Sequence, residues 1–151
     1  MYDALATKDP ERLTEADLGT LYKHAGFEPE KVVREASPRA GVSIRWDQYG
    51  VPYVTGATYD DVMFGAGYAA TGDRMFLMDA LRHAGKARLA EFAGGTEGNL
   101  AMDRNQLRSA FYTEKEAAAQ IAALETRYGA EGARMTKAVD AYIDGINAAQ
   151  D

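Results

Sequence analysis

The sequence predicts an α+β fold that is mostly α-helical and contains one β-hairpin. Residues 42–55 alternate apolar and polar side chains around a glycine-containing turn, as two paired strands do. From residue 58 onward, apolar residues recur at helical spacing. The 151 residues include 28 alanines, whereas Leu, Ile, Val and Phe together supply only 26. The core is therefore thin for this length, and the chain is either a small alanine-rich bundle or a piece of a larger body.

Residues 1–40 are polar and of mixed charge, and we expect them to form a polar N-terminal helical extension. Thr14 and Asp17 have the spacing of a capping box, with Asp in the usual Glu position, and Gly26 suits the helix end. The stretch Glu28–Arg39 predicts a short helix followed by a connector.

Two segments, Val42–Trp46 and Val51–Thr55, predict the hairpin, and Asp47–Gly50 supplies its turn. An isolated hairpin is marginally stable in water, so it should join a sheet. No other segment shows a strand pattern. We therefore expect the partner sheet to lie outside this chain.

Two long helices are expected, at about 58–92 and 113–149. The first has Thr58 at its start, and its glycines should weaken it unless close packing compensates. It carries one apolar stripe: Phe64, Tyr68, Met75 and Met78.

The expected first helix runs to Phe92 and is followed by a polar loop, Thr96–Arg108. A capping box at Thr113–Glu116 opens the second helix, which should break near Gly129 and then resume. Its final apolar face comprises Met135, Val139, Tyr142, Ile143 and Ile146.

Composition excludes several classes of function. No run approaches the ~18 consecutive apolar residues of a membrane span, and residues 1–13 lack the pattern of a signal peptide. The absence of cysteine excludes disulfides, thiolate zinc sites and a cysteine nucleophile. A pI near 5.0 argues against nucleic acid. The two histidines, His24 and His83, are too few for most histidine-built metal sites.

Residues 64–70 contain a GxGxxA pattern, a permitted form of the dinucleotide-binding fingerprint. That motif requires a strand before the glycines and a helix beginning at them. Here the preceding residues already have helical character. The alternative, which we favour, is that Gly65 and Gly67 allow another element to pack closely.

A dense run of charge occupies the same helix. It offers paired carboxylates for acid–base chemistry. The alternative, which we favour, is a solvated helix face or a structural ion-pair network, since spacings such as Asp79 to His83 fit i,i+4 pairs. The three serines, Ser37, Ser43 and Ser109, lack a GxSxG context. We assign no catalytic, cofactor-binding or metal-binding residue, and substrate-binding residues stay unknown. The charged run comprises Asp73, Arg74, Asp79, Arg82, Lys86 and Glu91.

Three stretches between about Val42 and Asn147 resemble the start of the α chain in the penicillin acylase (penicillin amidase) family of N-terminal nucleophile hydrolases. Asp47–Val54 is similar to the family's D-x-x-G-V-P-H-I, with Tyr53 in place of the histidine and Trp46 where arginine is common. Residues 61–94 are similar to D-x-x-F-G-x-G-Y, A-x-D-R-L-F-Q-M and G-R-L-A-E-x-x-G, with Gly72 and Leu77 as departures. The third stretch combines Met102–Arg104 with Tyr142–Asn147.

This resemblance implies an α chain within an αββα fold that a β chain, absent here, completes. Both chains would arise from one self-processed precursor, and the β chain would begin with the catalytic serine, whose own α-amino group acts as base. The substrate would be a small N-acyl amide. The resemblance implies no cofactor in this chain, although members of the family bind a structural calcium through residues outside it. It also implies a periplasmic or extracellular location.

Two hypotheses follow. In the first, residues 41–151 are an acylase-like α-chain segment that is inactive alone and binds a β chain. In the second, the chain is a stand-alone helical binding module derived from such an acylase.

Overall fold

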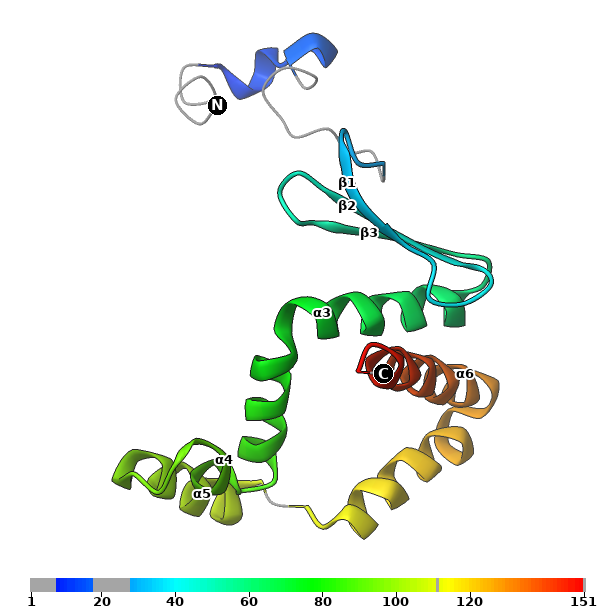
Figure 1. The fold of residues 1–151 in the computed structure, drawn as a ribbon. Coiled ribbons are helices and arrows are strands. Elements are labelled where there is room, and N and C mark those ends of the chain that lie inside the picture. Colours follow the sequence, from blue (N-terminus) through cyan, green and yellow to red (C-terminus); the bar gives the residue numbers. More distant parts are fainter. Residues whose placement is uncertain (1–7, 18–27, 111, 151) are drawn as a thin grey trace.

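The computed structural model describes residues 8–17, 28–110 and 112–150 (Figure 1). Three strands precede a set of helices, and two of these helices are long and bent. The elements are η1 (Pro10–Arg12), β1 (Val32–Ala36), β2 (Val42–Asp47), β3 (Pro52–Gly56), α3 (Tyr59–Gly85), α4 (Leu89–Ala93), α5 (Glu97–Ser109) and α6 (Glu114–Ala148).

The capped start expected at Thr14 is present. The Thr14 N–H donates to Asp17 Oδ2 (3.1 Å), and the Asp17 N–H donates to Thr14 Oγ1 (3.3 Å). A hydrogen bond from Lys8, together with those from Thr14, lowers the pKa of Asp17 to about 2. The rest of the expected helix, including His24 and Gly26, lies outside the described residues.

The hairpin is confirmed as β2 and β3, which pair antiparallel from Val42↔Gly56 to Trp46↔Pro52. Asp47 organises the turn, because its Oδ1 accepts the N–H groups of Tyr49 (2.8 Å) and Val51 (2.9 Å).

The third strand, β1, corrects two expectations. Residues 32–36 pair antiparallel with β2, with Arg34 opposite Trp46. The short helix expected within Glu28–Arg39 is therefore wrong, as is the statement that no other segment forms a strand. The sequence VVREA lacks the alternating pattern of a strand, because four of its five residues are exposed. Apolar and polar residues alternate clearly only where one face of the strand is buried.

The first half of α3 lies between the sheet and the second half of α6 (Figure 1). Two glycines permit the crossing of the helices. A Cβ atom at Gly67 would lie 2.1 Å from the Tyr142 carbonyl oxygen, and one at Gly145 would lie 2.0 Å from the Phe64 carbonyl oxygen. The backbones of α3 and α6 are thus in direct contact at two reciprocal points.

The opposite face of α3 packs on the sheet. A Cβ atom at Gly65 would lie 2.5 Å from Val54 Cγ1. Side chains from β2, α3 and α6 form the buried apolar core, in which Ile44 is fully buried. The core comprises Val42, Ile44, Trp46, Phe64, Ala69 and Ala141.

Each long helix contains one non-helical residue. In α3 it is Arg74 (φ −136°, ψ 18°), and in α6 it is Gly129 (φ 56°, ψ −132°), which confirms the break expected there. Because α3 turns away after Arg74, the expected apolar stripe is buried at Phe64 but exposed at Met75.

The final face of α6 also differs from expectation. Its buried residues are small: Gly132, Ala138, Ala141 and Gly145. Gly145 lies at the close crossing with α3, whereas a Cβ atom at Gly132 would lie 2.1 Å from the Leu124 carbonyl oxygen of α6 itself, across the bend at Gly129. Met135, Val139 and Ile143 are each about half exposed.

The region between the long helices is more helical than expected. The first helix ends at Gly85 rather than Phe92, and Ala87 takes a positive φ of 55° before α4 begins. The polar loop expected at Thr96–Arg108 is wrong, since α5 occupies it.

Asp103 of α5 fixes the start of α4. Its carboxylate accepts the backbone N–H of Leu89 (2.8 Å) and that of Ala90 (2.9 Å). Arg88, the residue before α4, provides no side-chain cap, so a carboxylate from the neighbouring helix satisfies the free N–H groups.

We expect Gly67→Ala and Gly145→Ala each to destabilise the chain by about 1–3 kcal/mol or more, because the added methyl group overlaps a carbonyl oxygen. Urea unfolding followed by circular dichroism measures this loss. Gly72→Ala is the matched control, because a Cβ atom added at Gly72 would meet nothing within 4 Å. It should be neutral or stabilising, and an equal loss in all three variants would contradict the close-contact explanation.

A second prediction concerns the junction between the sheet and α3. Hydrogen bonds from Thr58, and then from Arg39, lower the pKa of Asp61. A carboxyl with a lowered pKa in the folded state adds stability above its ordinary pKa of about 3.9, and this contribution is lost as pH falls through the lowered value. Asp61→Asn should therefore flatten the acid limb of the stability–pH curve, measured by thermal unfolding between pH 2.5 and 7. Asp60→Asn is the neighbouring control and should preserve that limb.

A third prediction concerns α4. Asp103→Ala removes the acceptor of two backbone N–H groups, which should cost about 1–2 kcal/mol locally. Hydrogen exchange should show faster exchange in residues 89–93 with unchanged protection in β2. Asp140→Ala, which removes an exposed carboxylate of α6, is the control. Unchanged protection of α4 in Asp103→Ala would show that the cap is dispensable.

Candidate functional site

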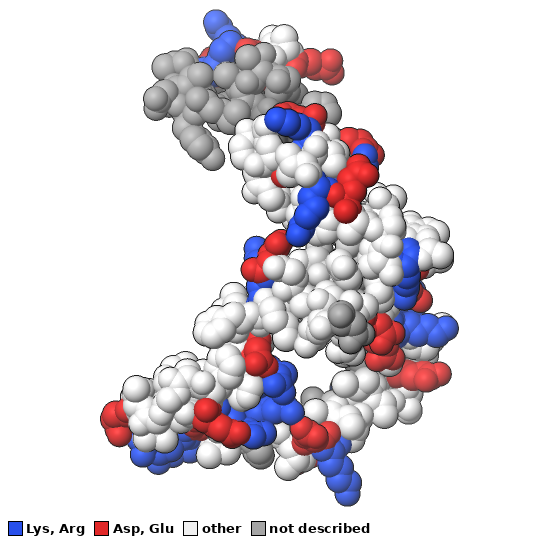
Figure 2. All heavy atoms as spheres, in the orientation of Figure 1, with Lys and Arg blue, Asp and Glu red and all other residues white. Residues whose placement is uncertain are grey.

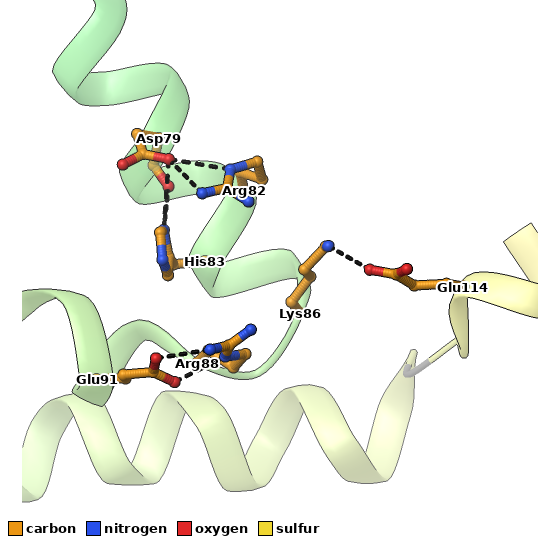
Figure 3. Close-up of polar contacts among 7 residues, drawn as sticks. All are labelled: Asp79, Arg82, His83, Lys86, Arg88, Glu91 and Glu114. Atoms are coloured by element: carbon orange, nitrogen blue, oxygen red, sulfur yellow. Dashed lines mark hydrogen bonds and ion pairs between the residues drawn. The ribbon is translucent and has the colours of Figure 1, made fainter.

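The charged run of the second half of α3 forms ion pairs within the helix and with the elements that follow it (Figure 3). Asp79 Oδ1 accepts from Arg82 Nε (2.9 Å) and Nη2 (2.7 Å). Lys86 extends to Glu114 at the start of α6. The first contact lies within α3, and the second joins the end of α3 to the start of α6 at the surface.

Arg88 and Glu91 form a two-point ion pair beside this set, with distances of 2.7 and 2.6 Å. Hydrogen bonding by Arg88 lowers the pKa of Glu91, and hydrogen bonding by Lys86 lowers the pKa of Glu114. Both carboxylates are thus ionised at neutral pH. An acid–base pair needs two groups whose pKa values are driven apart, so the geometry favours the ion-pair interpretation.

His83 is part of the packing between α3 and α4. Its ring stacks on Phe92, with centroids 4.6 Å apart and an interplanar angle of 22°. Its Nδ1 lies 2.8 Å from the Asp79 carbonyl oxygen (Figure 3). The ring is therefore held on both sides by its own helix and its neighbour, which is the arrangement of a packing residue.

The GxGxxA glycines do not lie at a helix start. α3 begins at Tyr59, so its N-terminal amides precede Gly65 by more than one turn. Gly65 faces the sheet and Gly67 faces α6. Since both glycine faces are covered by other elements, the pattern serves close packing and presents no cradle for a pyrophosphate.

Two serines border the β1–β2 pair, and the third ends α5. Ser43 is in β2, Ser37 follows β1, and Ser109 at the end of α5 donates its hydroxyl to the Asn105 carbonyl (2.8 Å). Among the described residues, no serine hydroxyl bonds to a histidine, and no group of three His, Asp or Glu side chains has metal-binding geometry. None of the described helices is both long and apolar enough to cross a membrane.

Three acidic residues of the family motifs accept hydrogen bonds from backbone N–H groups. Asp47 binds the hairpin turn, Asp61 binds the start of α3, and Asp103 binds the start of α4. The Tyr53 hydroxyl approaches Asp47 Oδ2 at 3.4 Å from the position where the family pattern has histidine. These motifs therefore stabilise the fold. Sequence reasoning missed the role of Asp103 because its partner α4 is 13–14 residues away.

Large apolar side chains remain exposed on the helices outside the crossing. Phe76 and Leu81 on α3 are 77% and 62% exposed. Figure 2 shows a largely uncharged middle on the visible face, with charged side chains gathered around the α4–α5 end. These exposed apolar side chains are the candidate interaction surface of the chain. Further exposed members are Leu77, Leu100, Met102, Leu107, Ile121, Tyr128, Met135, Val139 and Ile143.

Comparison with solved structures supports the fold class. The thermostable penicillin G acylase from Alcaligenes faecalis superposes with a TM-score of 0.56 and 27% identity, over 77% of this chain and 53% of that chain. The α+β class is thus confirmed, with a three-stranded sheet in place of a lone hairpin.

The relatives found by sequence are acylases as well. The acyl-homoserine lactone acylase QuiP of Pseudomonas putida is 32% identical over 107 residues, which are 71% of this chain and 12% of the relative. That of Pseudomonas syringae pv. syringae is 30% identical over 129 residues, which are 82% of this chain and 14% of the relative. The chain thus spans about an eighth of these relatives' length. The penicillin amidase family model matches residues 41–151, and the chain belongs to the penicillin amidase family.

Proposed function

We propose that this chain is the N-terminal part of the α subunit of an amidohydrolase that cleaves linear N-acyl amides. The catalytic N-terminal serine would be supplied by a β chain from the same precursor, and this chain alone would be inactive. The family match over residues 41–151, combined with a span of only 12% and 14% of two relatives, supports this proposal.

The exposed surface is the physical observation that favours a missing partner. The chain exposes 11023 Å², whereas a compact monomer of 16.4 kDa exposes about 7,500 Å². The excess of about 3,500 Å² is larger than one partner's share, about 1,000–2,500 Å², of a typical permanent subunit interface. The exposed apolar residues of α3, α5 and α6 would form part of the contact with the β chain.

The role of this chain in the reaction would be structural. The β-chain serine hydroxyl would attack the amide carbonyl, its α-amino group would take the proton, and water would then release the acid. The residues described here would support the sheets that carry this serine. No side chain of this chain is assigned a role at the reacting atoms.

The substrate class follows from the relatives. One is named for acyl-homoserine lactones and another for penicillin G. Both names describe an acyl group on an amide nitrogen, so we propose an N-acyl amide without choosing its leaving group. Self-processing of a precursor and a periplasmic or extracellular location belong to the same proposal.

The second candidate, a stand-alone binding module, has one observation in its favour. The sheet, α3 and α6 share a buried core within this chain. Under this hypothesis the 151-residue chain would unfold cooperatively and protect the amides of residues 42–55 from exchange, without any partner.

The proposed hydrolase is tested by activity. The purified 151-residue chain should show no turnover of a chromogenic phenylacetyl amide or of an acyl-homoserine lactone above the buffer rate. A longer polypeptide that continues past residue 151 should hydrolyse at least one of them and should yield a new serine N-terminus, detected by mass spectrometry. Turnover by the 151-residue chain would overturn the claim that it is inactive alone, and an inactive, uncut longer polypeptide would favour the binding module.

A further inference from the structure

A cavity of about 280 Å³ lies where β1 and β2 meet the end of α6. This volume is just below the usual range of small-molecule sites, so it suits a small ligand. The cavity is separate from the ion pairs of Figure 3. Its lining residues are Arg34, Ala36, Trp46, Tyr68, Gly72 and Ala149.

Arg34 brings positive charge to this cavity. Its guanidinium carbon lies 3.7 Å from the centroid of the Trp46 ring, directly across the β1–β2 pair. Several other arginines hold carboxylates, as Arg39 holds Asp61 and Arg45 holds Glu28. In the described part of the chain, the Arg34 side chain has no such acidic partner. Its donors are fixed in place by stacking and are available to an acceptor.

Trp46 forms part of the cavity wall, and its indole N–H lies buried beneath the accessible surface of that wall. The residue is 4% exposed, and its indole Nε1 is the one buried side-chain nitrogen or oxygen atom in the described residues that lacks a hydrogen-bond partner. A buried N–H without an acceptor costs free energy, so it is seldom left unsatisfied without a reason. The remaining wall is formed largely by small residues, Ala36, Gly72 and Ala149, which leave room for an apolar group.

The C-terminal end of α6 works against the binding of an anion beside Arg34. Ala149 is its C-cap, and the last carbonyl groups of a helix disfavour an anion. That effect is spread over a helix end, whereas the guanidinium offers two parallel donors to one carboxylate. The Arg34 contact should therefore dominate.

We propose that this cavity is a carboxylate-binding site, in which Arg34 holds the carboxylate and the apolar part of the ligand lies against Trp46 and Tyr68. The carboxylate has two conceivable sources: a free small carboxylic acid, or an Asp or Glu side chain of polypeptide beyond the described residues. The site is independent of the proposed hydrolysis.

Trp46 is the single tryptophan of the chain, so it reports on this site alone. The probes are cyclohexanecarboxylate and its neutral isostere cyclohexanecarboxamide, neither of which absorbs at 295 nm. Titration of the 151-residue chain with the acid should change the Trp46 fluorescence and move its indole N–H resonance. The amide should bind about tenfold or more weakly, because it lacks the charge.

Arg34→Gln should reduce the affinity for the acid by about tenfold. Arg45→Gln is the matched control, because Arg45 lies on β2 beside Trp46 but pairs with Glu28. It should bind the acid as the unmodified chain does. Equal binding of acid and amide, an unchanged affinity in Arg34→Gln, or no response to the acid would each overturn the proposal; the last result would indicate water as the occupant.

The source of the carboxylate is distinguished in a longer polypeptide that continues past residue 151. If free acid is the ligand, the Trp46 response to cyclohexanecarboxylate persists there. If an internal side chain fills the site, that response is lost, and Arg34→Gln lowers the Tm of the longer polypeptide more than Arg45→Gln does. An unchanged Tm together with a lost response would overturn the proposal for the longer protein.

Discussion

The fold depends on the direct contact between the backbones of α3 and α6. Gly67 and Gly145 lie at the two reciprocal contact points, and a methyl group at either would overlap a carbonyl oxygen of the facing helix. This approach places α3 in the middle layer, where its other face can receive the sheet. It also explains why Ala138, Ala141 and Gly145, rather than large side chains, occupy the face of α6 that meets α3. Tight contact over small residues replaces the large apolar side chains that the composition lacks.

Three aspartates of the family motifs bind backbone N–H groups in this chain. Asp47, Asp61 and Asp103 each accept N–H groups that would otherwise be unsatisfied at a turn or a helix start. Such groups are costly to bury, and one carboxylate can satisfy two of them. A motif of this kind specifies a fold without specifying a reaction. This is why the match to acylases is consistent with the absence of any nucleophile–base pair among the described residues.

Sequence reasoning succeeded where a local signal determines the structure. The capping boxes at Thr58 and Thr113, the hairpin and the break at Gly129 depend on a few neighbouring residues, and all are present. It failed where the structure depends on distant partners. β1 is defined by its pairing with β2. α5 has no buried residue, so its sequence carries no apolar stripe that would separate it from a loop. The kink at Arg74 has no proline or glycine at that residue to announce it, and the stripe was therefore extended too far.

The bend at Arg74 in α3 and the bend at Gly129 in α6 each separate a packed half of the helix from an unpacked half. The packed halves share the crossing and the core, whereas the second half of α3 and the first half of α6 carry exposed apolar residues such as Phe76 and Ile121. A helix of this length gains most of its stability from tertiary contacts on its apolar face. The described residues leave these unpacked halves largely uncovered, because α4 and α5 cover only part of one of them. Under the proposed function, the thin core and the exposed helices have one cause: this chain would carry apolar surface for a larger core and fills only the part around the glycine crossing.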